Sequence, residues 1–175
     1  IENRDALVDY DKKILERDEH RKALTRWDGE TMKVHPVTGK KVPDEEARVE
    51  VYRYIRPRAA KWPKSDFIVG NPPFIGNKRM RKRLGDLYCQ AVRTAWPKVP
   101  KSVDIVMYWW ERAAELTSAG MSRSFGLIST NSIKQITNRA VIAKWLSAKK
   151  PINLVFAIPD HPWRDEETDA QVRMA

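Results

Sequence analysis

The sequence predicts an α/β fold, in which a mostly parallel sheet is flanked by helices. Strand-like and helix-like segments alternate between residues 65 and 158, which is the order of βαβ units. The expected strands are short apolar runs, as in strands covered on both faces, and polar residues follow two of them. With 175 residues and 42% hydrophobic content, the chain can bury one moderate core.

Before residue 65 the pattern differs. Residues 1–7 are predicted to contain the end of a strand, and residues 8–64 an insertion made of a small helix and a hairpin. Residues 7–27 are rich in charge and have weak periodicity, whereas residues 49–55 are strand-like and residues 37–40 give a turn signal. We therefore expect the main α/β part to begin at residue 65.

The elements of this main part follow in order. An apolar run at residues 67–70 predicts a strand, and Asn77 is expected to cap a helix whose apolar stripe continues to Ala95. A second helix is expected at residues 104–119, with Gly120 as its stop. Each helix would cover a face of the sheet.

Two more strands and a helix complete the pattern. Residues 124–130 predict a strand, which polar Asn131 follows, and residues 138–149 predict a helix with Leu146 among its inward-facing residues. Residues 152–158 are expected to form the last buried strand. Because the carboxyl ends of parallel strands meet at one edge of a sheet, polar residues after these strands are expected to lie together.

The tetrapeptide Asn71-Pro72-Pro73-Phe74 directly follows the first strand of the main part. An amine on a heteroaromatic ring is a poor nucleophile, because its lone pair is delocalised into the ring. The Asn71 side-chain oxygen and the Pro72 carbonyl would each accept one amine hydrogen, which directs the lone pair at an incoming methyl group. Pro73 helps to fix this bend, and Phe74 offers a flat face to a base that has left its stack. The alternative interpretation is a plain turn, since Asn and Pro are common turn residues.

Residues 66–74 resemble the catalytic motif of amino-group DNA methyltransferases, and residues 75–80 resemble the MmeI-like branch found in restriction-modification and phage-defence proteins. Weaker likeness continues over nearly the whole chain, at residues 1–6, 104–110, 125–132 and 152–160. The resemblance implies a Rossmann-like fold, S-adenosylmethionine as the cofactor, and residues 65–175 as the catalytic half of the domain. It also implies that Asp5 accepts the amine of the cofactor's adenine, and it makes Asn71 a second cofactor-binding residue.

The family's glycine-rich cofactor loop is expected before Asp5, but the chain contains no Gly-x-Gly pair. We therefore interpret the chain as a fragment that lacks the first cofactor-binding strands and that methylates poorly or not at all on its own. Other parts of a parent protein would then supply the cofactor loop, target recognition and, where one is attached, a nuclease.

Charge is concentrated in the middle of the chain. Residues 1–64 carry a net charge of +3, residues 65–150 a net charge of +10, and residues 151–175 a net charge of −3. The surplus near the tetrapeptide favours a polyanionic partner, here double-stranded DNA. The predicted DNA-binding residues are Lys78, Arg79, Arg81, Lys82 and Arg83. The alternative interpretation of these five residues is a solvated basic face without specific contacts. For residues 8–64, three roles remain as alternatives: contact with DNA, contact with another part of the parent protein, or a lid or spacer.

Composition indicates a soluble domain. The sequence has no run of about 18 apolar residues, so we expect no membrane contact. One cysteine, Cys89, excludes an internal disulfide and fits the cytoplasm, and three dispersed histidines predict no metal site. The side chain of Trp163 is expected to face the site.

The function that these observations favour is methyl transfer from S-adenosylmethionine to the exocyclic N6 amine of a flipped adenine. Cytosine N4 needs the same two acceptors, but related enzymes more often place Ser or Asp where Asn71 stands. Guanine N2 in RNA and a glutamine side chain are further amine targets of such motifs, and the basic surplus disfavours the protein target. A catalytically inactive nucleic-acid-binding module is the alternative of another class.

Overall fold

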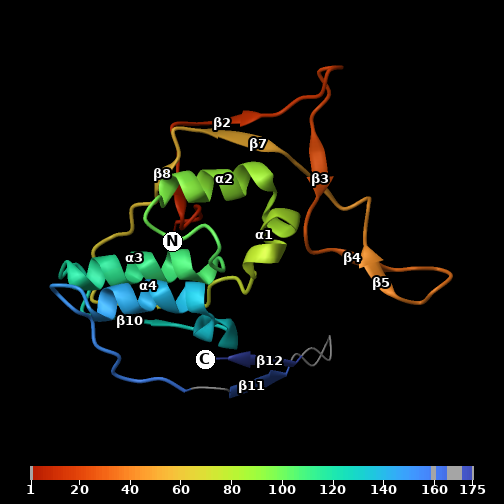
Figure 1. Cartoon of the computed structure of the whole chain (residues 1–175). Helices are drawn as coiled ribbons and strands as arrows, with labels where there is room; N and C mark the ends of the chain where they lie inside the picture. Colours follow the sequence, from red (N-terminus) through yellow and green to blue (C-terminus); the bar gives the residue numbers. More distant parts are fainter. Residues whose placement is uncertain (1, 159–160, 165–170, 175) are drawn as a thin grey trace. The chain divides into compact units, whose positions relative to one another are not determined.

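The computed structural model describes residues 2–158 and, for the backbone, residues 161–164 and 171–174 (Figure 1). The chain divides into two compact units. The first unit comprises residues 1–60 and 78–97, and the second comprises residues 61–77 and 98–175.

The first unit is built on one long antiparallel ribbon, which runs out and back between Val8 and Ala59. Its outgoing strands are β1 (Val8–Asp9), β2 (Lys12–Leu15), β3 (Thr25–Trp27) and β4 (Met32–Val34). Its returning strands are β5 (Lys41–Pro43), β6 (Arg48–Glu50), β7 (Tyr52–Ile55) and β8 (Arg58–Ala59). The pairs are nested, with β4 on β5, β3 on β6, β2 on β7 and β1 on β8.

Residues 8–64 contain no helix, so the small helix expected in the insertion was wrong. Most side chains of the ribbon are exposed or half-buried. A strand with no face buried in a core has no need to alternate apolar and polar residues. This explains why the charge-rich residues 7–27 gave only weak periodicity although they form strands.

Two helices of the first unit follow each other, α1 (Asn77–Leu84) and α2 (Asp86–Ala95). A single helix was expected here, but the chain breaks at Gly85, whose φ is +87°. A Cβ at Gly85 would lie 2.7 Å from Nε of Arg26. The Arg26 guanidinium donates to the carbonyl oxygens of Arg83 at 3.2 Å and Leu84 at 3.0 Å, which ends α1. Glycine is therefore required for conformation and for space.

The core of the first unit lies between α2 and the base of the ribbon. Trp96 donates its indole N–H to the Leu7 carbonyl at 3.0 Å, and the Tyr54 and Tyr88 rings meet edge to face at 5.9 Å. The buried apolar residues are Leu7, Val8, Ala60, Met80, Cys89, Ala91, Val92 and Trp96.

Among its described residues, the second unit contains α3 (Val106–Ser118), α4 (Ile136–Leu146), a 3₁₀ turn η1 (Asn131–Lys134), and four strands. The strands are β9 (Phe67–Gly70), β10 (Ser124–Leu127), β11 (His161–Arg164) and β12 (Gln171–Met174). Helix α3 ends as expected, because Gly120 follows it with φ +74°. Helix α4 lies between residues 136 and 146 and leaves Leu146 exposed, so the inward orientation expected for Leu146 was wrong.

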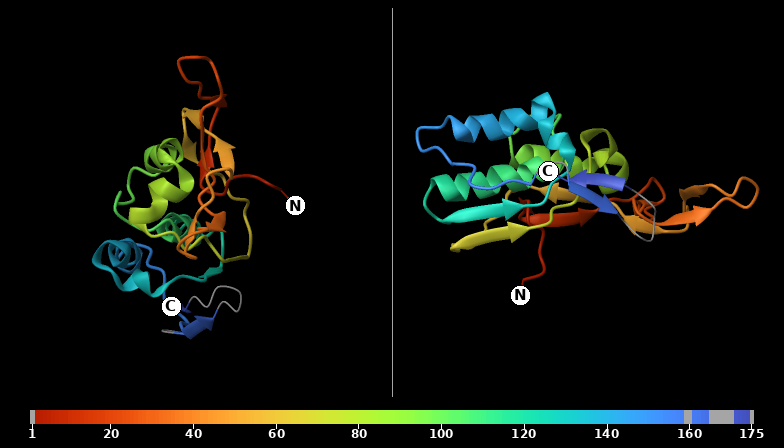
Figure 2. Two further views of the ribbon diagram at one scale, coloured as in Figure 1. Left: turned by 90° about the vertical axis from the view of Figure 1, so that its right-hand side faces the viewer. Right: turned by 90° about the horizontal axis from the view of Figure 1, so that it is seen from below.

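Strands β9 and β10 pair in parallel, with Gly70 opposite Leu127 (Figure 2). Phe125 of β10 meets Trp110 of α3 at 5.2 Å, so α3 covers one face of the pair. The opposite face is open, and on it Phe67 and Val69 are 63% and 86% exposed. The other five strand pairs of the described residues are antiparallel.

Residues 152–158 do not form the expected buried strand. Within the described part of the chain they have no strand partner, and only Ile152 is buried, whereas Val155 is 91% exposed. Residues 2–7 likewise contain no strand. The side chain of Trp163 lies outside the described part of the chain.

None of the α-helices in the described residues combines the length and apolar character that a membrane span requires.

Candidate functional site

The tetrapeptide Asn71–Phe74 lies where β9 ends, beside the end of β10. The Ile128 N–H donates to the Gly70 carbonyl at 3.1 Å, so the chain leaves both strands at the same edge of the pair. Asn71 is exposed, Pro72 is buried and Phe74 is half-buried. This is the edge on which Asn71 was expected.

Both proposed acceptors are available. Within the described residues neither the Asn71 side chain nor the Pro72 carbonyl takes part in a hydrogen bond. The Pro73 carbonyl, by contrast, accepts the Ile75 N–H at 3.1 Å and tightens the bend. Two oxygens on adjacent residues are therefore left for an external donor, as recognition of an NH₂ group requires.

A buried polar network holds the chain just after the tetrapeptide. The Asp104 carboxylate accepts the Asn77 N–H at 2.8 Å and the Asn138 side-chain amide at 2.9 Å. The Asn138 oxygen accepts the Asp104 N–H at 3.0 Å, and its amide also donates to the Ser132 carbonyl at 2.8 Å. Asp104 and Asn138 are both buried, so the two bonds between them are shielded from water.

The network connects two loops that are distant in sequence. Asn77 begins α1, at the end of the loop that follows β9, and Ser132 belongs to η1, which follows β10. The backbone reinforces the first connection, because the Ile105 N–H donates to the Ile75 carbonyl at 3.1 Å. Asp104 and Asn138 thus fix both loops at the edge where Asn71 is exposed.

Asp104 and Asn138 were not among the residues predicted for the site. A signal was present, because Asp104 stands at the start of an expected helix, where Asp commonly accepts backbone N–H groups. The partner that it accepts from, Asn77, lies in a different loop, and no local pattern indicates that contact.

Asp5 lies in the first unit, in a turn rather than at the end of a strand. Its Oδ1 accepts the N–H groups of Leu7 at 2.8 Å and Val8 at 2.9 Å. The Tyr88 hydroxyl bonds to the same carboxylate, and burial, followed by the charge and hydrogen bond of Asp5, raises the pKa of Tyr88. A carboxylate has about four acceptor positions, so Asp5 retains capacity for one more donor.

The five basic residues predicted to bind DNA differ in their surroundings. The Arg83 guanidinium donates to the Gly29 carbonyl at 2.9 Å, so it has a structural role. Lys82 lies over the Trp27 ring, with Nζ 5.6 Å from the ring centroid. Arg81 pairs with Asp86 at 3.5 Å on the surface. The remaining two, Lys78 and Arg79, are exposed and form no ion pair within the described residues.

Among the described residues, no group of three or more His, Cys, Asp or Glu side chains is arranged to hold a metal ion.

The tetrapeptide thus places, at the end of a parallel strand pair, two oxygens that have no hydrogen bond within the described residues and one half-buried aromatic ring. The family model described as MmeI, DNA-methyltransferase domain, matches residues 19–175, and the chain belongs to this family. Membership makes the chain part of a methyltransferase of the MmeI type, with DNA as the substrate that such a domain implies. No curated protein and no solved structure matches the chain.

Proposed function

We propose that this chain is the catalytic part of a DNA adenine-N6 methyltransferase in a restriction-modification or phage-defence protein. The observation that carries the proposal is the pair of unengaged oxygens on Asn71 and Pro72, in a bend whose following residues are held by buried Asp104. Two acceptors on one NH₂ group draw the nitrogen toward tetrahedral geometry and localise its lone pair.

Each residue of the tetrapeptide has a part in this proposal. Asn71 and Pro72 accept the two amine hydrogens, and Pro73 keeps the bend rigid through its fixed φ. Half-buried Phe74 stacks on the flipped adenine and replaces part of the stacking that the base loses on leaving the duplex. Because these groups are in place before the base arrives, little reorganisation is needed during the reaction.

We further propose that S-adenosylmethionine is the methyl donor, and that when bound it supplies an electrophilic methyl group. Asp5 fits a role in binding the cofactor's adenine amine, because its carboxylate can accept one donor beyond Leu7, Val8 and Tyr88. The Tyr88 hydroxyl orients that carboxylate. A glycine-rich loop outside these 175 residues would supply the remaining cofactor contacts.

The test uses the complete protein that carries this chain, with labelled S-adenosylmethionine and a duplex DNA of mixed sequence. Asn71→Ala should lower kcat by roughly 10²–10³-fold, the loss expected when one preorganised polar group is removed. Asn153→Ala is the matched control, because Asn153 is an exposed Asn of the same unit and should leave kcat unchanged. Full activity of Asn71→Ala would refute the catalytic assignment.

Nucleoside analysis of the product identifies the target atom. We expect N6-methyladenine, whereas N4-methylcytosine would change the assigned base and leave the roles of Asn71 and Pro72 unchanged. Parallel reactions with structured RNA and with protein distinguish the other amine targets. Salt-dependent DNA binding without any methyl transfer by the complete protein would instead support an inactive binding module.

A further inference from the structure

The ribbon of the first unit ends in a hairpin, Met32–Pro43, which we call the basic hairpin. It consists of β4, β5 and the turn at residues 35–40, and it extends away from α1 and α2 (Figure 1). In the turn, the His35 N–H donates to the Lys40 carbonyl and the Gly39 N–H to the His35 carbonyl, each at 2.9 Å. The His35 Nδ1 accepts the N–H groups of Val37 and Thr38 at 3.2 and 3.3 Å.

The base of this hairpin is also held firmly. The Asp28 carboxylate accepts the N–H groups of Glu30 at 2.9 Å and Thr31 at 3.0 Å. The hydrogen bond from the Thr31 hydroxyl, followed by these two backbone bonds, lowers the pKa of Asp28. The Asp44 N–H donates to the Thr31 carbonyl at 2.9 Å. The shape of the hairpin is therefore set before any partner binds, which reduces the entropic cost of binding.

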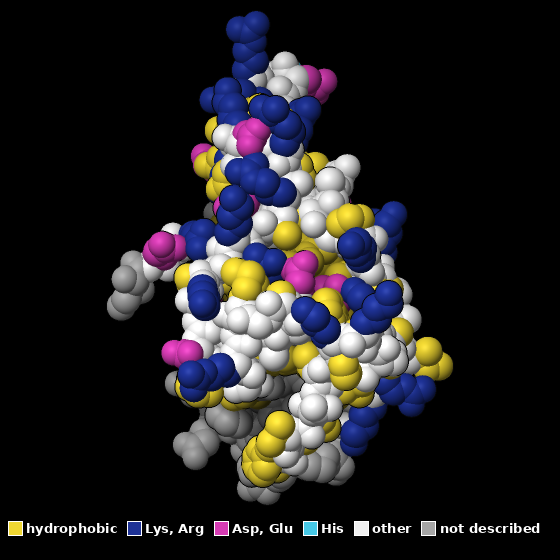
Figure 3. Space-filling view, turned by 90° about the vertical axis from the view of Figure 1, so that its left-hand side faces the viewer, with side chains coloured by type: hydrophobic (Ala, Val, Ile, Leu, Met, Phe, Trp, Pro, Cys, Tyr) yellow, Lys and Arg dark blue, Asp and Glu magenta, His cyan; other side chains and the backbone are white. Residues whose placement is uncertain are grey.

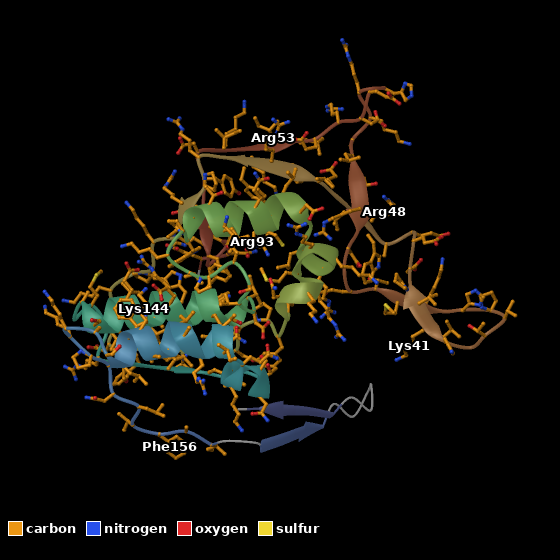
Figure 4. All side chains as sticks on the ribbon, in the orientation of Figure 1. Lys41, Arg48, Arg53, Arg93, Lys144 and Phe156 are labelled. Atoms are coloured by element: carbon orange, nitrogen blue, oxygen red, sulfur yellow. The ribbon has the colours of Figure 1, made fainter. Side chains whose placement is uncertain are left out.

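Charge distinguishes the basic hairpin from the rest of the ribbon. Residues 32–43 contain Lys33, Lys40 and Lys41 and no acidic residue, whereas residues 44–46 are Asp-Glu-Glu. Lys33 pairs with Asp44 at 3.4 Å. Lys40 and Lys41 are exposed and form no ion pair within the described residues; Figure 4 labels Lys41 on β5.

Elsewhere on the ribbon, three arginines have acidic partners. Arg53 pairs with Glu16, and both Arg56 and Arg58 pair with Asp11 at 2.6 Å. The face in Figure 3 shows this mixture, because Asp and Glu lie among the Lys and Arg side chains of its narrow upper part. The hairpin end therefore differs from the rest of the ribbon in having exposed cations and no acidic residue between residues 32 and 43.

Apolar side chains are exposed between these lysines. Val37, next to Pro36 in the turn, is 85% exposed, and Val34 is 64% exposed. Exposed valine side chains are more stable against an apolar surface than in water. Thymine methyl groups in the major groove of DNA offer such apolar contacts. The major groove of B-DNA is about 12 Å wide and admits a two-stranded β-ribbon.

We propose that the basic hairpin enters the major groove of the duplex DNA that this protein methylates. Lys40 and Lys41 contact phosphates on the two sides of the groove, and Val37 with Pro36 contacts base edges. The acidic residues 44–46 repel the phosphate backbone, which limits contact to the end of the hairpin. The inference rests on DNA being the substrate and adds a binding surface to that function.

The test measures binding of the complete protein, as its Asn71→Ala variant, to a duplex of mixed sequence at several salt concentrations. Lys40→Gln with Lys41→Gln should reduce the slope of log K against log salt by about 2, one for each lost phosphate contact. At about 0.1 M salt the Kd should rise roughly tenfold or more. The matched control, Lys149→Gln with Lys150→Gln, removes the same charge from exposed positions of the second unit and should leave the slope unchanged.

Val37→Ser tests entry into the groove separately from charge. This change should weaken DNA binding several-fold and leave the salt slope unchanged. A second experiment uses a duplex whose major groove is filled by glucosylated hydroxymethylcytosine, to which the parent protein should bind weakly. The loss of affinity caused by the glucosylated base should be smaller in the two-lysine variant. An unchanged slope in the two-lysine variant, an equal effect in the control, or no DNA binding at any salt concentration would overturn the proposal.

Methyl transfer distinguishes this proposal from the proposed function. If the two-lysine variant binds like the parent while Asn71→Ala abolishes methyl transfer, only the role of the hairpin is refuted. If binding depends on the hairpin but the complete protein transfers no methyl group, the hairpin proposal is supported and the proposed function fails.

Discussion

The two units of this protein satisfy their polar groups in opposite ways. In the first unit, the ribbon pairs its backbone between its own strands and its charges across an exposed surface. In the second unit, a few buried polar residues connect segments that are far apart in sequence, and Asn71 and Pro72 make no hydrogen bond within the described residues. The loops at the site are therefore held by a few buried polar contacts, whereas the ion pairs of the ribbon lie at its surface.

The largest expected effect is on the stability of the second unit, when the buried carboxylate of Asp104 is removed. Asp104→Ala leaves the Asn77 N–H and the Asn138 amide without their acceptor, and hydrogen bonds to a charged group contribute about 1.5–3 kcal/mol each. We expect the second unit to lose about 3–5 kcal/mol of stability, measured by urea denaturation, and the Asn77 amide to exchange faster. The control is Asp66→Ala, whose exposed pair with Arg123 should contribute little. Equal effects of the two changes would contradict the contrast between the units.

Glu111 provides a second, smaller test in the same unit. This buried residue of α3 pairs with Lys144 and accepts the Trp145 indole N–H at 2.7 Å, so it joins α3 to α4. Glu111→Gln should cost about 2 kcal/mol, the scale of a hydrogen bond to a charged group, and should shift the fluorescence of Trp145. Glu115→Gln, at an exposed position of the same helix, serves as the control and should change neither.

Acid should weaken the ribbon through its carboxylates. A hydrogen bond from Arg58, with further help from Arg56, lowers the pKa of Asp11, and Arg53 does the same for Glu16. Because these pKa values are depressed on folding, the stability they contribute is present above the ordinary values of 3.8 and 4.5. It is lost as the pH falls through the depressed values.

The protection factors of amides in β2 and β7, which correct for the slower intrinsic exchange in acid, should therefore fall on acidification below about pH 4. In Arg53→Gln, the part of this pH dependence that comes from Glu16 should disappear. An acid response that is the same in Arg53→Gln and in the parent would show that the exposed pair has no role.

The smallest effect concerns Cys89, which is buried in the first unit. Burial is the main cause that raises the pKa of this thiol, so the reactive thiolate is scarce in the folded protein. Alkylation by iodoacetamide near pH 8 should be at least about tenfold slower than for a free thiol, and urea should remove the difference. Fast alkylation of the native protein would show that the core of this unit opens readily.

Local sequence patterns predicted part of this architecture. The strand at Phe67–Gly70 and the helix that Gly120 stops follow from apolar runs and a glycine at a known position. The exposure of Asn71 at the end of that strand also follows from local order. In each case the deciding residues are neighbours in sequence.

The errors involve partners that are distant in sequence. The helix expected to reach Ala95 breaks at Gly85, whose φ is +87°, and the Arg26 guanidinium donates to the last carbonyls of α1. Residues 152–158 are apolar but have no strand beside them, and Phe156 projects from this segment (Figure 4). Recognition of Asp104 as part of the site required knowledge of its contact with Asn77. Composition and periodicity do not carry that information.

The nested pairing of the ribbon has a consequence for the order in which it folds. Val34 and Lys41 are close along the chain, whereas Val8 and Ala59 are joined only through everything between them. Because the entropy lost on loop closure grows with loop length, the turn at His35 should form first and the strands should then zip toward β1 and β8. A substitution to proline or glycine near the turn at His35 should lower the refolding rate more than the same substitution near Ala59.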